Sequence, residues 1–183
     1  VPESFNGSIG EEKAFEALRL LDDTYTVFHS FNWIGLEDRT QGEADFVIIH
    51  PQKGIMVVEV KAGEIEYKGG QWLQTNTLTR KTKYISPFNQ ASRSQFEILD
   101  RLKSDMRLGK APLVCHAVWF TSIVLKSSYK LPPEAPREIV FDETSLNKAK
   151  MDIDKAFDYW AKKTGINAFM NLRQLNEVVF ILA

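Results

Sequence analysis

The hydrophobic and polar positions along the chain predict strands that alternate with helices. Segments rich in β-branched and aromatic residues indicate strands, and two of them are joined by a five-residue connection that contains a glycine. One longer apolar run is typical of a strand that is buried on both faces. The predicted strands are residues 25–33, 42–49, 55–63, 64–69, 111–122 and 137–141.

Apolar residues at helical spacing predict three helices. The first begins at Ser8, whose S-x-x-E pattern with Glu11 matches a capping box. The second follows Pro87, and a third is expected at residues 151–163, where acidic residues come early and basic residues late, as the helix dipole favours. The apolar stripe of the second helix consists of Ala91, Ile98, Leu99, Leu102 and Met106.

The order of these elements indicates an α/β fold in which helices flank a mixed sheet. A helix, three strands, a second helix and a further strand come first, and helical additions follow. Periodicity does not decide between helix and strand for the closing segment, residues 172–183. With 183 residues, of which 44% are hydrophobic, we expect a single domain. Its core would span about residues 8–125, and its C-terminal extension about residues 126–183.

Charge and cysteine content narrow the class of protein. A net charge of −1 excludes a globally basic protein that coats nucleic acid, although a local cationic groove remains compatible with it. The single cysteine, Cys115, lies in an apolar run, which favours a reducing, cytoplasmic setting. No apolar run approaches membrane-spanning length. The sequence begins at Val1 without an initiator Met, so we expect a piece of a larger multidomain protein.

Three charged residues interrupt the apolar strands of the predicted hairpin, "GEADFVIIHPQKGIMVVEVKAG" at residues 42–63. If residues 50–54 form the connection, the register places Asp45 directly opposite Glu59. Side chains alternate between the faces of a strand, so Glu59 and Lys61 project on the same side. Two carboxylates at the separation of opposed Cβ atoms, about 4.5–5.5 Å, repel each other and destabilise a sheet.

A divalent cation would offset this repulsion. Mg²⁺ prefers oxygen ligands and takes one or two protein carboxylates, so Asp45 and Glu59 are candidate metal ligands. Lys61 beside them could orient the attacking water and stabilise charge that develops on phosphorus. This is the outline of hydrolytic phosphate chemistry. The alternative is purely structural: Asp45 bonds local backbone at a strand edge, and Glu59 forms an ion pair with Lys61 on the same strand.

These residues resemble a known family. The segments "SIGEE", "GEADFVIIHPQKGIMVVEVKAGEI" and "KYISPFNQ", together with Trp72, are similar to the nuclease-related domain called NERD, a branch of the PD-(D/E)XK nuclease superfamily. The resemblance covers about residues 8–108. One departure is Ala44, which stands where the name of the superfamily expects a proline, although many members lack it. The resemblance implies a restriction-endonuclease-like αβββαβ core that acts on nucleic acid with Mg²⁺ or Mn²⁺.

The same resemblance implies a role for each site residue. Asp45 and Glu59 would be metal ligands, Lys61 the catalytic lysine, Glu11 the acid of the first helix and a further metal ligand, and Gln90 the glutamine of the second helix. For Glu11 the capping box is an equally good explanation. For Gln90 the alternative is a solvated side chain.

A basic stretch predicts the substrate contact. Arg80, Lys81 and Lys83 could contact phosphates with Trp72 and Tyr84 nearby, although such loops are usually only solvated. The function expected from all of these features is a divalent-metal-dependent nuclease that acts on DNA, with tethered modules such as a helicase as partners. The alternative is a catalytically silent module of a larger helicase- or kinase-type protein, which binds nucleic acid or a protein partner.

Overall fold

The structure is a computed structural model, and it describes residues 9–35, 40–105 and 109–183. Ser8, expected to open the first helix, and Met106, expected in the stripe of the second, lie outside the described residues. Within those three ranges, no helix is both long and apolar enough to cross a membrane.

A five-stranded mixed sheet forms the centre of the molecule, with strand order β1-β2-β3-β7-β8. The first three strands are antiparallel, whereas β7 runs parallel to β3 and β8 runs parallel to β7. This arrangement confirms the predicted α/β class with an αβββαβ core, because a helix links the parallel pair β3 and β7. The strands are β1 (Thr26–Ile34), β2 (Gln41–His50), β3 (Gly54–Lys61), β7 (Val114–Phe120) and β8 (Val140–Phe141).

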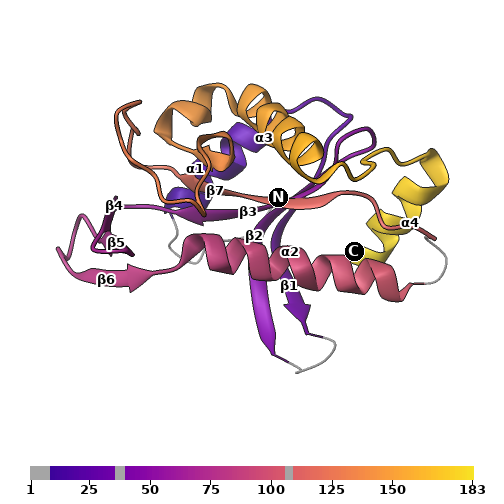
Figure 1. The fold of residues 1–183 in the computed structure, drawn as a ribbon, viewed down its shortest axis with the longest axis horizontal. Helices are drawn as coiled ribbons and strands as arrows, with labels where there is room; N and C mark the ends of the chain where they lie inside the picture. The colour runs from indigo at the N-terminus through magenta and orange to yellow at the C-terminus, as the bar shows by residue number, and fades with distance from the viewer. Residues whose placement is uncertain (1–8, 36–39, 106–108) are drawn as a thin grey trace.

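Helices cover both faces of this sheet. Figure 1 shows α1 and α3 on one face and α2 on the other. The closing segment is a helix, and it packs its buried residues Val178 and Leu182 in the same hydrophobic cluster as Ile98 and Leu102 of α2. All seven residues of β7 are buried, as expected for a strand between two helical layers. The helices are α1 (Ile9–Leu18), α2 (Pro87–Ser104), α3 (Ala149–Thr164) and α4 (Leu172–Leu182).

A second, three-stranded antiparallel sheet lies at one end of the molecule, opposite α4 (Figure 1). It consists of β4 (Glu64–Lys68), β5 (Gln71–Thr75) and β6 (Thr82–Ile85), inserted between β3 and α2. Trp72 fixes it to the core, since its buried ring packs against Phe88 at 5.5 Å and Phe120 at 5.3 Å between centroids. The sequence predicted β4 but not β5 or β6, because both are short and largely polar.

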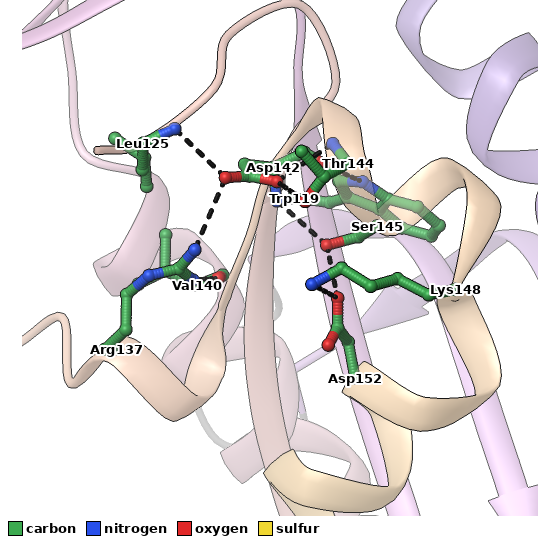
Figure 2. Close-up of polar contacts among 9 residues, drawn as sticks. All are labelled: Trp119, Leu125, Arg137, Val140, Asp142, Thr144, Ser145, Lys148 and Asp152. Atoms are coloured by element: carbon green, nitrogen blue, oxygen red, sulfur yellow. Dashed lines mark hydrogen bonds and ion pairs between the residues drawn. The ribbon is translucent and has the colours of Figure 1, made fainter. Parts of the chain in front are cut away.

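A buried carboxylate, Asp142, joins the turn after β8 to the segment that follows β7. Figure 2 shows its side chain accepting hydrogen bonds from the backbone N–H of Leu125 at 3.0 Å and from the backbone and hydroxyl of Thr144 at 2.9 and 2.6 Å. Burial alone would raise the pKa of the Asp142 carboxyl, but these hydrogen bonds outweigh it and lower the pKa below 3.8. Asp142 is therefore a structural anchor.

The strand predicted at residues 137–141 is shorter than expected. Residues Arg137–Ile139 form a 3₁₀ turn that begins after Pro136, and only Val140 and Phe141 pair with β7. A second 3₁₀ turn, Glu143–Asn147, is capped by Asp142 and leads into α3. The proline restricts φ at the start of this segment, so a tight turn replaces the first residues of the expected strand.

Candidate active site

The hairpin of β2 and β3 has the register that the sequence predicts. Val47 pairs with Val57 and Ile49 with Ile55, and the regular ladder ends where Phe46 pairs with Val58. Asp45 and Glu59 are the next residues along the two strands, where the regular ladder has ended, so their direct pairing stays a prediction. The backbone N–H of Val60 donates a hydrogen bond to Asp45 Oδ2 at 2.6 Å, so the Asp45 side chain bridges to the neighbouring strand. This contact is the local backbone bond that the structural alternative expected.

Glu59 and Lys61 lie on the same face of β3. Lys61 Nζ is 2.6 Å from Glu59 Oε1, and their side chains are only 17% and 6% exposed. Both charges of this ion pair lie close enough to Asp45 to affect its pKa. A buried carboxylate needs such a partner, because an unpaired charge away from water is costly. The pair agrees with the structural alternative as well as with a catalytic lysine beside a metal ligand.

The pKa values show that the acids act on one another. Burial, and then repulsion from Glu59, raise the pKa of Asp45 from 3.8 to about 7, against the opposing hydrogen bond from Val60. Burial also raises the pKa of Glu59, and the attraction of Lys61 offsets this increase only in part. The sheet therefore holds two partly buried carboxylates close enough to repel, with one ammonium beside them.

Glu11 is directed toward this pair from α1. Its negative charge contributes to the raised pKa values of both Asp45 and Glu59. The helix can approach the sheet because the residue before Glu11 is Gly10, where an added Cβ would lie 2.8 Å from the Cβ of Ala62, just after β3. Ser8 lies outside the described residues, so the capping-box interpretation of Glu11 stays a prediction.

His29 is a contact of Glu11 that the sequence did not reveal. His29 Nε2 lies 3.4 Å from Glu11 Oε2, and the two side chains are 11% and 21% exposed, respectively. The His29 ring packs against Phe15 of α1 and Phe46 of β2, with centroid distances of 5.7 and 4.9 Å. No spacing in the sequence links residue 11 to residue 29, because the contact depends on how α1 packs on the sheet.

Ser30 adds a second unexpected feature beside Asp45. It interrupts the pairing of β1 with β2, between the pairs His29–Phe46 and Phe31–Ala44, and its φ of 51° is unusual for a residue other than glycine. The irregularity thus lies directly across from Asp45. Strained backbone of this kind concentrates at functional sites, where the surrounding structure holds it in place.

Among the described residues, no hydrogen bond or ion pair joins the remaining predicted residues to Asp45 or Glu59. Gln90 is exposed in the first turn of α2, next to the buried Phe88 and Ala91, and within the described residues no hydrogen bond joins its side chain to the acids. Its catalytic role stays a prediction. Nothing in its local pattern distinguishes it from a solvated glutamine.

The basic residues are on the turn between β5 and β6 and, in the case of Lys83, on β6 itself. Arg80, Lys81 and Lys83 are all exposed, and Arg80 Nη1 forms an ion pair with Glu64 Oε1 at 2.7 Å. Of the two aromatic residues near them, Tyr84 is 72% exposed, whereas Trp72 is 3% exposed and belongs to the core. Only Tyr84 is therefore accessible for stacking on a base.

The chemistry of the donor set fits a magnesium or manganese ion with few protein ligands. Over the described ranges, no three or more His, Cys, Asp or Glu side chains are grouped to hold a metal ion. Mg²⁺ does not require such a cage, because it keeps several waters and binds through one or two carboxylates together with substrate phosphate. Asp45 and Glu59 supply two partly buried oxygen donors whose mutual repulsion a cation would relieve.

Comparison with known families gives one match. Residues 6–124 match the model of the family described as NERD, nuclease-related domain. Searches of curated proteins and of solved structures each returned no match. The matched range contains α1, the hairpin of β2 and β3, the small sheet, α2 and β7, and therefore every candidate site residue described above.

Proposed function

Because the chain belongs to the NERD (nuclease-related domain) family within the PD-(D/E)XK nuclease superfamily, we propose that it is a divalent-metal-dependent nuclease that hydrolyses phosphodiester bonds in DNA. The observation that carries this proposal is the electrostatic repulsion between Asp45 and Glu59 on neighbouring strands. Glu59 is buried and Asp45 is half-buried, and repulsion from Glu59 helps burial to raise the pKa of Asp45 to about 7. A sheet that served only as a scaffold gains nothing from this repulsion.

Asp45 and Glu59 are the residues that would hold Mg²⁺ or Mn²⁺, with Glu11 as a further candidate. When bound, such an ion supplies charge neutralisation at phosphate and lowers the pKa of a coordinated water. The Val60 N–H fixes the Asp45 carboxylate through its Oδ2, and Gly10 lets α1 approach closely enough to direct Glu11 toward the pair.

Lys61 is the cation of the proposed site. Its ammonium lies beside Glu59 and is 17% exposed, so it remains within reach of a substrate at the surface of the sheet. We assign it the stabilisation of negative charge that develops on phosphorus. Arg80, Lys81 and Lys83 would hold neighbouring phosphates, and Gln90 could contact a phosphate oxygen or a water without adding charge.

A catalytically silent binding module is the second candidate. The observation that favours it is the Glu59–Lys61 ion pair, because Lys61 neutralises Glu59 without a metal ion. In that case the basic turn would still bind nucleic acid or a partner. The near-neutral net charge predicts that binding by this chain is weak and depends strongly on salt, so tethered modules would provide targeting.

Cleavage assays with matched variants separate the two candidates. Plasmid and oligonucleotide substrates are incubated with Mg²⁺ or Mn²⁺ and with the wild type, Glu59→Ala or Lys61→Ala. We expect Glu59→Ala to lose Mn²⁺ binding, measured by calorimetry, and to lose cleavage as well. Lys61→Ala should still bind Mn²⁺ but should no longer cleave. Glu66→Ala and Lys68→Ala are the controls, since they change the same E-x-K pattern at exposed positions of β4. Cleavage that survives Glu59→Ala unchanged would reject the nuclease proposal.

A further inference from the structure

The turn between β5 and β6, residues 76–81, lies beside the end of the strand that carries Glu59 and Lys61. Thr75, the last residue of β5, pairs with Glu64, which is only three residues after Lys61. The side chain of Gln74 also donates a hydrogen bond to the carbonyl oxygen of Ala62 at 2.7 Å. The 76–81 turn therefore starts next to the candidate active site, although 14 positions of sequence separate Lys61 from Thr75.

Hydrogen bonds hold this turn in one shape. The side-chain oxygen of Asn76 accepts from the backbone N–H groups of Leu78 and Thr79 at 2.9 and 2.8 Å. Its backbone N–H donates to the carbonyl of Lys81, and its carbonyl accepts from the N–H of Arg80, both at 2.9 Å. Arg80 is kept at a φ of 56°, which an arginine rarely adopts by itself. A turn that is ordered in advance loses little conformational entropy when it binds.

Leu78 projects from this turn almost completely into solvent, with 86% exposure. A single exposed leucine is common, but this one is on a hydrogen-bonded turn, two residues before Arg80 and three before Lys81. Residues 63–86, which form the small sheet with its turns, contain four Lys or Arg and only two Glu, whereas the whole chain has a net charge of −1. The apolar side chain thus stands at the apex of a locally basic element.

We propose that Leu78 is an apolar wedge that enters a DNA duplex and separates two adjacent bases near the cleaved bond. Arg80, Lys81 and Lys83 would bind the phosphates on either side of it. The inference rests on the proposed nuclease function and adds to it a substrate class, base-paired DNA that is distorted on binding. Proteins that kink DNA combine the same two components, an inserted apolar side chain and basic groups on the backbone.

The wedge explains a requirement of the site. Glu59 and Lys61 are largely buried in the surface of a sheet, so a phosphodiester within a straight duplex has to be drawn toward them. Unstacking a base step bends the duplex and brings its backbone closer to the protein. The same mechanism predicts faster cleavage at steps that unstack easily, such as mismatches, bulges and flexible pyrimidine–purine steps.

The first experiment measures unstacking directly. Duplexes that carry 2-aminopurine at successive positions are mixed with the Glu59→Gln variant, which should bind without cleaving, and with the same variant that also carries Leu78→Ala. We expect a fluorescence increase at one or two adjacent positions that Leu78→Ala removes. Leu20→Ala is the matched control, because Leu20 is an equally exposed leucine (85%) in the turn that follows α1.

The second experiment measures cleavage by the full 183-residue chain. Leu78→Ala should cleave a fully paired duplex about tenfold more slowly than the wild type, because the variant no longer contributes to unstacking. A duplex with a bulge at the same position should be cut equally fast by both, and Leu20→Ala should match the wild type on each substrate. Rescue by the bulge distinguishes a wedge from a general loss of folding or binding.

Different results overturn the two proposals. If Glu59-dependent cleavage is present but Leu78→Ala behaves like the wild type on paired and bulged duplexes, Leu78 is not a wedge and the nuclease proposal stands. A contact of Leu78 with a protein partner would give this outcome. If no substrate is cleaved in a Glu59-dependent manner, the nuclease proposal fails, and the wedge proposal fails with it.

Discussion

Replacing Asp45 by Asn should stabilise the protein, and more so at higher pH. The variant keeps a side-chain oxygen that can accept the Val60 N–H and removes the charge that faces Glu59. Burial, and then repulsion from Glu59, raise the pKa of Asp45 from 3.8 to about 7. Between pH 3.8 and about pH 7, Asp45 therefore keeps a proton in the folded protein that it has released in the unfolded chain.

The sign and the size of the effect follow from this difference. A carboxyl group whose pKa is raised on folding makes the free energy of unfolding decrease as pH rises from about 4 to about 7, and the loss persists at higher pH. The two pKa values of Asp45 differ by about three units, which corresponds to a total loss of about 4 kcal/mol in the free energy of unfolding. From about pH 5 to about pH 8, the advantage of Asp45→Asn over the wild type should grow by about 3 kcal/mol.

Comparison of the two proteins is essential because His116 acts in the opposite direction. Burial, assisted by the charge of Lys163, lowers the pKa of His116 from 6.5 to about 4, so its contribution makes the folded state more stable as pH rises through this range. The pH dependence of the wild-type free energy of unfolding combines the contributions of Asp45 and His116. The difference between Asp45→Asn and the wild type cancels His116 and isolates Asp45 with its neighbour Glu59.

Urea unfolding in the presence of a chelator provides the measurement. Free energies of unfolding are determined at several pH values for the wild type, Asp45→Asn and Asp23→Asn, which changes an exposed aspartate and should show no such trend. Addition of Mg²⁺ at high pH should stabilise the wild type and leave Asp45→Asn unchanged. If the difference in free energy of unfolding between Asp45→Asn and the wild type does not vary with pH, the pKa of Asp45 is not raised in the folded protein and the reasoning is refuted.

Four further substitutions test other parts of the structure. Glu11→Gln and His29→Phe should each weaken Mn²⁺ binding about tenfold in calorimetry, and the double variant should lose no more than the stronger single one, because His29 acts through Glu11. Asp142→Ala should lower the free energy of urea unfolding by about 3 kcal/mol at neutral pH, and its deficit should shrink below pH 4, where the wild-type carboxyl becomes protonated. Trp72→Ala should cost about 3–5 kcal/mol in the same assay, because its buried ring joins the small sheet to the core.

The parts of the fold that depend on local pattern could be predicted from the sequence. The hairpin register was fixed by two apolar strands around a short connection, and Gly54 at its end adopts a φ of 101°, a conformation that favours glycine. The buried strand β7 was evident from its continuous apolar run. In these cases one segment carries all of the information that its structure requires.

The closing segment shows where a local signal was available but was not used. Its apolar residues fit either period, so hydrophobicity alone did not separate helix from strand. The structure shows a capping box in which the side chains of Asn171 and Gln174 each accept the backbone N–H of the other residue, at 2.9 and 3.0 Å. An Asn followed three residues later by Gln is a helix-start pattern that can be found in the sequence.

The candidate site divides in the same way. The proximity of Asp45, Glu59 and Lys61 could be predicted because the three residues lie on two adjacent strands, whereas their catalytic roles stay predictions. The Glu11–His29 contact and the strained Ser30 could not be found, since they depend on the packing of α1 against β1 and on an irregularity in the ladder. Spacing along the chain contains no information about either.

Gly63 links the proposed catalytic strand to the proposed wedge. It is in the two-residue connection between β3 and β4 with a φ of 87°, and an added Cβ would lie 2.7 Å from the carbonyl oxygen of Thr75. Only glycine allows β5 to return so close to the end of β3. Lys61 and the 76–81 turn are thus held on the two sides of one tight junction. A nuclease that must distort its substrate before cleavage requires such a connection, because the wedge and the carboxylates have to act on the same stretch of DNA.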